Sequence, residues 1–176
     1  VMLISGVSRA GRGDWERAHA QLQTSAALFG QLRHSKRQEQ ALTSIGHMHA
    51  IRGTFPQVLE VNRTVLASAR GRSDAQMQGS ALVWQAAAYV MLKQTKTALQ
   101  HIQQAYPLFV NSEDQGLQII GYAVLALAEL RADRANPEPA LAHAQIALDL
   151  LDAAPTSYSA LPAISGLAGM ALNMWE

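Results

Sequence analysis

The chain has 176 residues, of which 49% are hydrophobic and 6% aromatic, with a formal net charge of +1 and no cysteine. This length and apolar content suit one compact domain or one short repeat array. The lack of cysteine excludes disulfides and thiolate metal sites and is compatible with the cytoplasm, where we expect the protein to reside. Ala and Leu are abundant, which favours closely packed helices over a sheet.

The apolar segments are too short to span a membrane. The longest covers roughly residues 117–130 and contains Gln118 and Glu129, so it is also too polar. The amino terminus lacks the basic and apolar regions of a signal peptide. Because the chain starts at Val1 and stops inside a predicted helix, we expect it to be a piece of a longer protein.

Apolar residues at three- and four-residue steps predict an all-α protein of nine helical elements joined by short turns. No segment alternates with a period of two for long enough to be a strand. We expect Pro107 to kink or end the sixth element and Pro162 to distort the start of the ninth. The elements fall at about residues 1–10, 14–32, 35–51, 54–69, 73–91, 95–105, 112–127, 136–151 and 156–175.

Several turns carry residues that start or stop helices. Asp14 and Asn136 are predicted N-caps, Pro137 is expected at the first helical position of its element, and Gly53 is expected to be a left-handed C-cap. A Ser or Thr followed three residues later by Gln predicts a capping box. This pattern occurs at Ser35 and Gln38, Thr54 and Gln57, Ser73 and Gln76, and Ser112 and Gln115.

One phrase recurs about every forty residues and sets a repeat. Gly53-Thr54-Phe55-Pro56-Gln57-Val58 matches residues 13–18, and weaker copies lie at 93–98 and 135–140. The period predicts stacked helical hairpins in a single array over residues 1–176. Its units span about 1–33, 34–72, 73–111 and 112–153, with a partial unit at 154–176.

Alignment of the repeats gives columns of small or apolar residues. We expect small residues in the first helix of each unit to let the two helices of a hairpin approach closely. An aromatic residue, Trp15 or Phe55, is expected to wedge between helices at the turn. The columns are Ala18, Val58, Ala98 and Ala140; Leu22, Asn62, Ile102 and Ala144; Ser25, Val65, Ala105 and Ala147; and Gly6, Gly46, Ala86 and Ala126 or Ala128.

These columns, with Gly at the turn and the aromatic two residues later, resemble the tetratricopeptide repeat (TPR), whose unit is about 34 residues long. The period of this chain is longer than that of the tetratricopeptide repeat. In this period, and in the segments 13–18 and 171–176, the chain resembles the carboxy-terminal arms of large bacterial signalling ATPases, of the cyclase-linked or maltose-activator type. The resemblance implies a right-handed α-α solenoid of antiparallel hairpins. It also implies a non-catalytic interaction, sensor or scaffold region whose partners are a protein or peptide and other domains of the parent chain.

Two other roles remain open. The chain could be the peptide- or small-ligand-binding arm of a transcription regulator, or a self-assembly module that forms homo-oligomers. In TPR-like arrays the first helices of successive hairpins line a concave groove, which can hold an extended peptide or a helix. The repeat register places six residues on that groove: Gln40, Thr43 and His47 from one unit, and Ser80, Val83 and Ala87 from the next.

The sequence offers no catalytic, cofactor-binding or metal-binding residues. His47 and His49 are two apart, so on a helix they point about 200° from each other and should not share a metal. Gly6, Gly11 and Gly13 lack the strand and the Lys-Ser/Thr of a phosphate-binding loop.

Charge is distributed unevenly along the chain. The first hundred residues hold twelve Lys and Arg against five Asp and Glu, and the remainder hold two against eight. We expect the basic residues to lie mostly at helix ends and turns, as solvated charge. Nucleic acid is therefore an unlikely partner.

Overall fold

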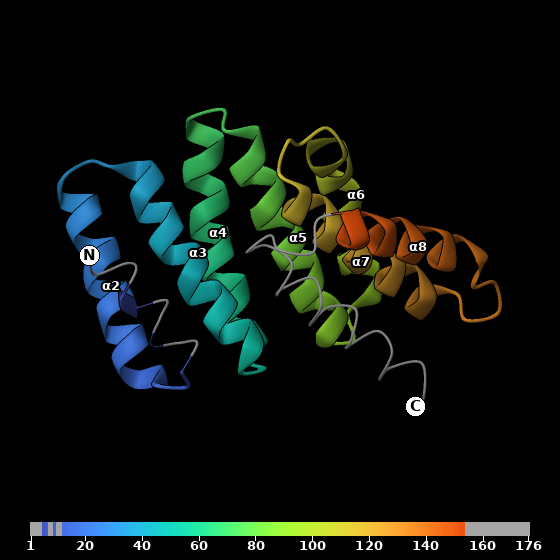
Figure 1. Cartoon of the computed structure of the whole chain (residues 1–176), viewed down its shortest axis with the longest axis horizontal. Coiled ribbons are helices and arrows are strands. Elements are labelled where there is room, and N and C mark those ends of the chain that lie inside the picture. Colours follow the sequence, from blue (N-terminus) through green and yellow to red (C-terminus); the bar gives the residue numbers. More distant parts are fainter. Residues whose placement is uncertain (1–4, 7–8, 10–11, 154–176) are drawn as a thin grey trace. The chain divides into compact units, whose positions relative to one another are not determined.

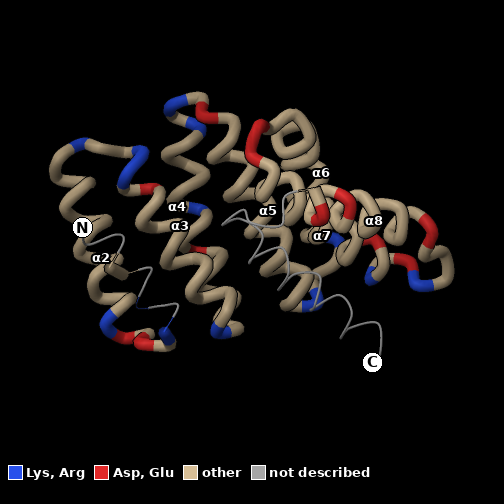
Figure 2. The backbone as a smooth tube through the Cα atoms, in the orientation of Figure 1, with Lys and Arg blue, Asp and Glu red and all other residues tan. Residues whose placement is uncertain are grey.

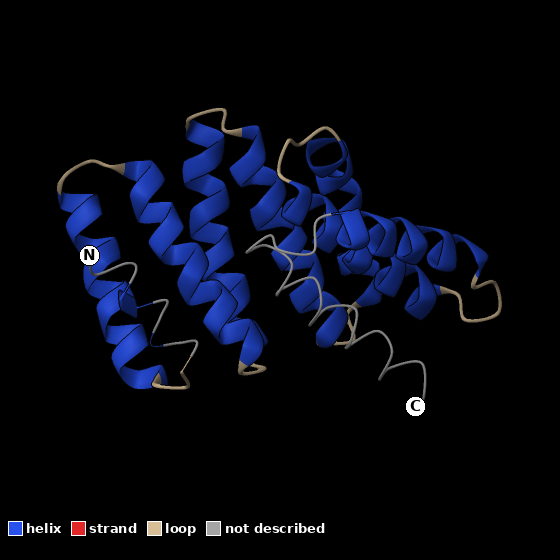
Figure 3. Ribbon diagram, in the orientation of Figure 1, coloured by secondary structure: helices blue, strands red, loops and turns tan. Residues whose placement is uncertain are grey.

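The computed structural model describes residues 5, 6, 9 and 12–153, and within them the chain is all-helical with no strand (Figures 1 and 3). The seven helices of this part confirm the second to eighth predicted elements. The predicted ninth element at 156–175, including Pro162, and most of the first lie outside the described residues. The helices are α2 (Trp15–Gln31), α3 (Ser35–Ile51), α4 (Phe55–Gly71), α5 (Ala75–Met91), α6 (Thr95–Val110), α7 (Gln115–Ala132) and α8 (Glu138–Ala153).

Each of the first four helices is 17 residues long, and α2 to α6 start at every twentieth residue. The forty-residue sequence period therefore contains two helix-turn steps of equal length. α6 continues through Pro107 to Val110, so the expected end of the element at this proline is wrong. Because Pro107 lies in the last turn, its missing N–H costs the helix few hydrogen bonds.

The turns before α2, α3, α4, α5 and α6 share one geometry, built around a left-handed residue every twenty positions. Gly13, Arg33, Gly53, Ser73 and Lys93 have φ of +78°, +53°, +71°, +55° and +60°. The next backbone N–H then bonds back over the helix end, for example from Thr54 to the carbonyl of His49 at 2.9 Å. This is a Schellman closure. It confirms the left-handed Gly53.

The helix starts differ from the predicted caps. None of the four capping boxes forms among the described residues, and Asp14 and Thr54 stand at the N-cap positions of α2 and α4 without a side-chain cap bond. Instead, the carboxylates of Asp74 and Asp114 accept from the N–H groups of Met77 and Leu117 and cap α5 and α7. The reason is geometric, because the positive φ of Ser73 moves the N-cap one residue onward.

The start of α8 also lies later than predicted. Asn136 was expected to be its N-cap and Pro137 its first residue, but the helix begins at Glu138. The N–H of Leu141 bonds to the carbonyl of Pro137 at 2.9 Å. The carboxylate of Asp133 accepts from the N–H of Ala135 and of Asn136. Because the backbone N–H of Asn136 takes part in this local turn, Asn136 does not act as the predicted N-cap.

Contacts divide the chain into two compact units, Val1–Ser73 with α2 to α4 and Asp74–Glu176 with α5 to α8. We refer to them as unit 1 and unit 2. The boundary coincides with the end of the second predicted repeat. In unit 1, α3 packs against α2 and α4, and in unit 2, α6 packs against α5 and α7, and α7 also packs against α5 and α8. Charged residues lie mostly near helix ends in both units (Figure 2).

The repeat columns form the cores of the hairpins. A Cβ at Gly6 would lie 2.8 Å from Cγ of Leu22, and one at Gly46 would lie 3.2 Å from Nδ2 of Asn62. Small residues therefore do allow close helix approach in unit 1. The column members buried in the structure are Gly6, Ala18, Leu22, Ser25, Gly46, Val58, Asn62, Val65, Ala86, Ala98, Ile102, Ala105, Ala126, Ala128, Ala140 and Ala147.

α8 leaves large apolar residues at its surface. Leu141, Ile146 and Leu148 have the apolar character of core residues but are 52%, 38% and 43% exposed. The buried residues of this helix are Ala140 and Ala147. These lie seven residues apart on one face, and α8 packs against α7. Small side chains, rather than the largest apolar ones, therefore occupy the contact.

Candidate functional site

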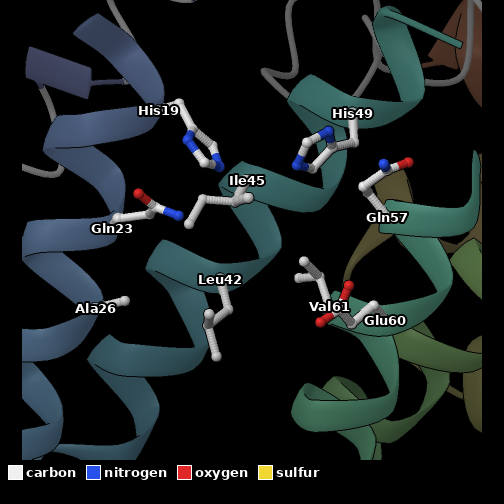
Figure 4. Close-up of a pocket in the computed structure, with 9 residues that line it drawn as sticks. All are labelled: His19, Gln23, Ala26, Leu42, Ile45, His49, Gln57, Glu60 and Val61. Atoms are coloured by element: carbon white, nitrogen blue, oxygen red, sulfur yellow. The ribbon is translucent and has the colours of Figure 1, made fainter. Parts of the chain in front are cut away.

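The candidate site is an open groove in unit 1, formed by α2, α3 and α4, with a volume of about 470 Å³ (Figure 4). Its floor is apolar, and its sides carry imidazole, amide and carboxylate groups. Such a combination suits a ligand with both apolar and hydrogen-bonding parts. The lining residues are His19, Gln23, Ala26, Leu42, Ile45, His49, Gln57, Glu60 and Val61.

The middle helix, α3, contributes Leu42 and Ile45 to the groove floor. Two separate faces of this helix are buried. One face carries Ala41, Ile45 and Met48, and the other carries Glu39 and Gly46. Because successive residues of a helix lie 100° apart around its axis, two half-buried strips of residues remain between these faces. The strip with Leu42 and His49 lies in the groove. We call it the groove strip.

The hydrogen bonds of Thr54 determine how His49 presents its ring. The Thr54 hydroxyl donates to the backbone carbonyl of His49 at 3.1 Å, and its Oγ1 lies 2.8 Å from Nδ1 of the same histidine. A hydroxyl has one hydrogen, so Nδ1–H must be the donor in the second bond. Nε2 of the neutral ring then carries a lone pair. Figure 4 shows one ring nitrogen of His49 directed into the groove, toward His19.

His19 and His49 come together from α2 and α3. Their ring centroids are 5.5 Å apart, and the planes meet at 72° in an edge-to-face arrangement. Burial lowers the pKa of His49 below its usual value, and the nearby charges of His19 and Arg52 lower it further. Glu60 acts in the opposite direction. His49 is therefore neutral at pH 7 and available as an acceptor.

The α4 side of the groove contributes the negative charge. Glu60 and Val61 point toward the groove from α4, and Gln57 lies one turn earlier (Figure 4). Gln23 lies across from them on α2. Glu60 is the only acidic residue among the nine lining residues described. The groove therefore combines hydrogen-bond acceptors with an apolar floor.

The residues predicted to line a concave groove do not line this groove of unit 1. Gln40, Thr43 and His47 lie half-buried on the second strip of α3, about 160° around the helix from the groove strip. We call this second strip the opposite strip. Burial lowers the pKa of His47 to about 4, so this ring is also neutral at pH 7.

The other half of the predicted set belongs to unit 2. Ser80 and Ala87 are half-buried on α5, but the exposed fraction of Val83 is 0%. The expectation that Val83 offers an exposed surface is therefore wrong. α5 packs against both α6 and α7 within its unit, which leaves this helix little free surface.

Sequence reasoning missed the approach of His19 to His49, although the turn could have revealed it. In an antiparallel hairpin, residues equidistant from the turn lie opposite each other. The turn between α2 and α3 is centred near His34, and His19 and His49 each lie 15 residues from it. Ala26 and Leu42, both lining residues, are each eight residues away. The predicted register was used to compare repeats, but not to pair residues across this turn.

Unit 2 contains an aromatic cluster. The ring of Tyr122 contacts those of Tyr106 and Phe109 edge-to-face and stacks on His143 at 6.0 Å. Nδ1 of His143 lies 2.8 Å from Oε2 of Glu129. Burial raises the pKa of Tyr122, as does its contact with Tyr106. These contacts join α6, α7 and α8.

The described part of the chain contains no group of three or more His, Asp or Glu residues that could hold a metal ion. None of its helices combines the length and apolarity needed to cross a membrane. Comparison of the sequence with protein-family models and with curated proteins gave no match.

Proposed function

We propose that this chain is a non-catalytic interaction region that binds a protein or peptide, and that its hairpins form a TPR-like, right-handed α-α solenoid. The observation that carries the binding role is the groove of unit 1, with its apolar floor of Leu42, Ile45 and Val61 and its polar sides. An extended peptide needs apolar contacts for alternate side chains and polar partners for its backbone. This groove supplies both.

The regular helix-turn plan supports the solenoid. A left-handed residue recurs every twenty positions from Gly13 to Lys93, and small residues fill the contact inside each hairpin. In repeat proteins each unit buries its apolar face against its neighbours, so surface residues can vary independently of the repeat. Seven of the nine lining residues lie outside the buried core, which leaves them free to serve recognition, whereas Ala26 and Ile45 belong to the core.

The chemistry of the lining favours binding over catalysis. The groove brings together imidazole, amide and carboxylate groups, but none of its nine described lining residues is Ser, Cys, Thr, Lys or Tyr. A hydroxyl, thiol or amine nucleophile is therefore absent from these nine residues. In this proposal any catalysis takes place in other domains of the parent, a bacterial signalling ATPase in the cytoplasm. The chain transmits the bound state to those domains.

Peptide selection tests the binding role directly. Peptides are selected on phage against the full chain, and the affinity of the best one is measured by calorimetry. The groove variant Leu42→Gln/Val61→Gln replaces two half-buried apolar residues by polar ones of moderate size. We expect it to weaken binding by about tenfold or more, since each residue loses apolar contact with the peptide. Circular dichroism verifies that the variant is folded.

The opposite strip provides the matched control. Gln40→Ala/Thr43→Ala/His47→Ala changes the other exposed side of the same helix, and we expect it to leave the affinity unchanged. A loss confined to this triple variant would move the binding site to the face predicted from the repeat register. If no selected peptide is sensitive to either variant, the binding role is wrong.

The parent protein can be tested through the sequence that flanks this segment. An upstream nucleotide-binding domain with a phosphate loop would support the signalling ATPase. A helix-turn-helix directly beside the segment would instead support the arm of a transcription regulator. Neither result would alter the test of the groove.

A further inference from the structure

We infer that the groove of unit 1 recognises an arginine side chain carried by an extended peptide, an inference that rests on the proposed binding role. The guanidinium group lies between His49 and Glu60, and its aliphatic stem lies along the floor. The occupant follows from the charge and the hydrogen-bonding groups of the lining.

The groove presents acceptors at a position where a cation can reach them. His49 directs Nε2 inward, because Nδ1–H is held by Thr54. Glu60 adds a carboxylate and is close enough to His49 to influence its ionisation. None of the nine described lining residues is Lys or Arg. An anionic ligand would therefore meet the carboxylate of Glu60, while Arg52, the arginine that acts on His49, is not among the lining residues.

Arginine fits this arrangement better than lysine. Its planar guanidinium has five N–H donors in a fixed fork, so it can donate to an imidazole nitrogen and a carboxylate together. Lysine carries a compact ammonium and is a weaker match for two acceptors held on different helices. The three methylenes of arginine can pack on Leu42, Ile45 and Val61 while its charged end reaches the rim.

The amide side chains provide a place for the peptide backbone. Gln23 on α2 and Gln57 on α4 lie on the two sides of the groove. A glutamine amide offers both a donor and an acceptor, as a peptide group requires. An extended chain that crosses the groove can therefore bond to both sides while one side chain enters it.

Acid should weaken this recognition. The charged or titratable groups that act on His49 are His19 from α2, Arg52 from its own helix and Glu60 from α4. Protonation of His49 converts the Nε2 acceptor into a donor and places a positive charge beside the guanidinium. Binding should therefore be strongest where His49 is neutral.

The experiment is an NMR titration of the full chain with acetyl-Leu-Arg-Leu-amide at neutral pH. Matched peptides carry Lys, norleucine or Glu at the central position. We expect the arginine peptide to shift the amide resonances of His49 and Glu60 and to bind about tenfold more tightly than the norleucine peptide, a typical gain from a charge-assisted hydrogen bond. Lys should be intermediate and Glu weakest.

The variant Glu60→Gln tests the ionic contact. It should reduce affinity for the arginine peptide by about tenfold and leave the norleucine peptide unchanged. Glu16→Gln is the control, because Glu16 is an exposed acid on α2 that does not line the groove. Lowering the pH from about 7.5 to about 5.5 should weaken the arginine complex, and His49→Gln should reduce that pH dependence.

The possible failures are distinguishable. If the peptides bind to the groove without preference for arginine, or if Glu60→Gln has no effect on the arginine peptide, the inference is wrong and the binding role survives. If the arginine peptide shifts no groove resonance at millimolar concentration, the inference is also wrong. The binding role is then decided by the selected peptides and their sensitivity to Leu42→Gln/Val61→Gln.

Discussion

The two units use the same helix-turn plan but leave different surfaces. In unit 1, α3 keeps two half-buried strips, one of which lies in the groove. In unit 2, α7 has eleven buried residues, and its core includes the completely buried Phe109 from α6. The helix starts differ as well, because Asp74 and Asp114 cap α5 and α7, whereas α2, α3 and α4 have no side-chain cap bond.

This difference shows that the repeat register determines which residues pack inside a hairpin, but not how exposed the other side chains are. Thr43 and Val83 are forty residues apart in the repeat, yet Thr43 is half-buried and Val83 is completely buried. Gly46 and Ala86, also forty apart, are both buried. We conclude that α5 is covered more fully than α3 at some equivalent repeat positions, and that α3 keeps half-buried residues that line the groove.

The largest expected effect separates the stability of the two units. Phe109→Ala removes a ring that has 0% exposure and contacts Tyr106 and Tyr122. We expect it to lower the free energy of unfolding of unit 2 by about 3–5 kcal/mol. Hydrogen exchange should show reduced protection in α5 to α8 and little change in α2 to α4. Equal loss of protection in both units would contradict their independence.

Tyr106→Phe is the control for Phe109→Ala. Tyr106 belongs to the same cluster but is 40% exposed, and this substitution keeps the ring. We expect a much smaller change in the free energy of unfolding, about 1 kcal/mol or less, from loss of the hydroxyl contact to Tyr122.

Acid should destabilise unit 1 through His47. Burial lowers the pKa of this residue to about 4 in the folded protein, from 6.5 when unfolded, so the unfolded chain binds its proton more readily. The stabilisation is complete above pH 6.5 and is lost as the pH falls toward 4, by roughly 2–3 kcal/mol. Urea unfolding as a function of pH measures it.

His47→Gln provides the comparison, because glutamine does not titrate in this range. It should flatten the fall in the free energy of unfolding between pH 6.5 and 4. An unchanged pH dependence in this variant would show that other groups cause the acid sensitivity.

The caps of unit 2 offer a smaller test. Asp74→Ala removes the carboxylate that accepts from the N–H of Met77 at 3.0 Å, and should cost about 1 kcal/mol of unfolding free energy. Gln94 is the N-cap of α6 but makes no side-chain cap bond. Gln94→Ala should therefore have little effect in the same urea titration. Equal losses would show that the Asp74 bond contributes nothing specific.

The smallest expected effect concerns the turns. Lys93 adopts the left-handed conformation that Gly53 adopts forty residues earlier, with φ of +60° against +71°. Lys93→Gly should stabilise unit 2 by about 0.5 kcal/mol, because relief of backbone strain exceeds the added entropy of the unfolded chain. Gly53→Ala should destabilise unit 1 for the converse reason. Thermal unfolding of both variants tests the pair, and a loss of stability for Lys93→Gly would contradict it.

Much of the fold could be predicted because it depends on local rules. Seven helices follow from apolar residues at three- and four-residue steps, and the left-handed Gly53 follows from its place after an apolar stripe. The caps could not be assigned as reliably, since Ser73 and Asp74 are both good N-cap residues. The backbone conformation of the turn selects Asp74.

The exposed surfaces could not be predicted in the same way. Leu141 and Leu148 have the apolar character of core residues, yet the contact of α8 uses Ala140 and Ala147. The amphipathic pattern of a helix specifies which residues share a face, but not how much of that face another helix covers.

The sequence by itself determined the helical class, the forty-residue period and the small residues at hairpin contacts, because each depends on spacing along one chain. Tertiary structure decided that non-glycine residues in the turns adopt the left-handed conformation every twenty positions. It also decided the two strips of α3 and the groove. It brought His19 beside His49 and placed Thr54 where its single hydroxyl hydrogen sets the tautomer of that ring. These features require three helices and a turn to pack together, so no single segment specifies them.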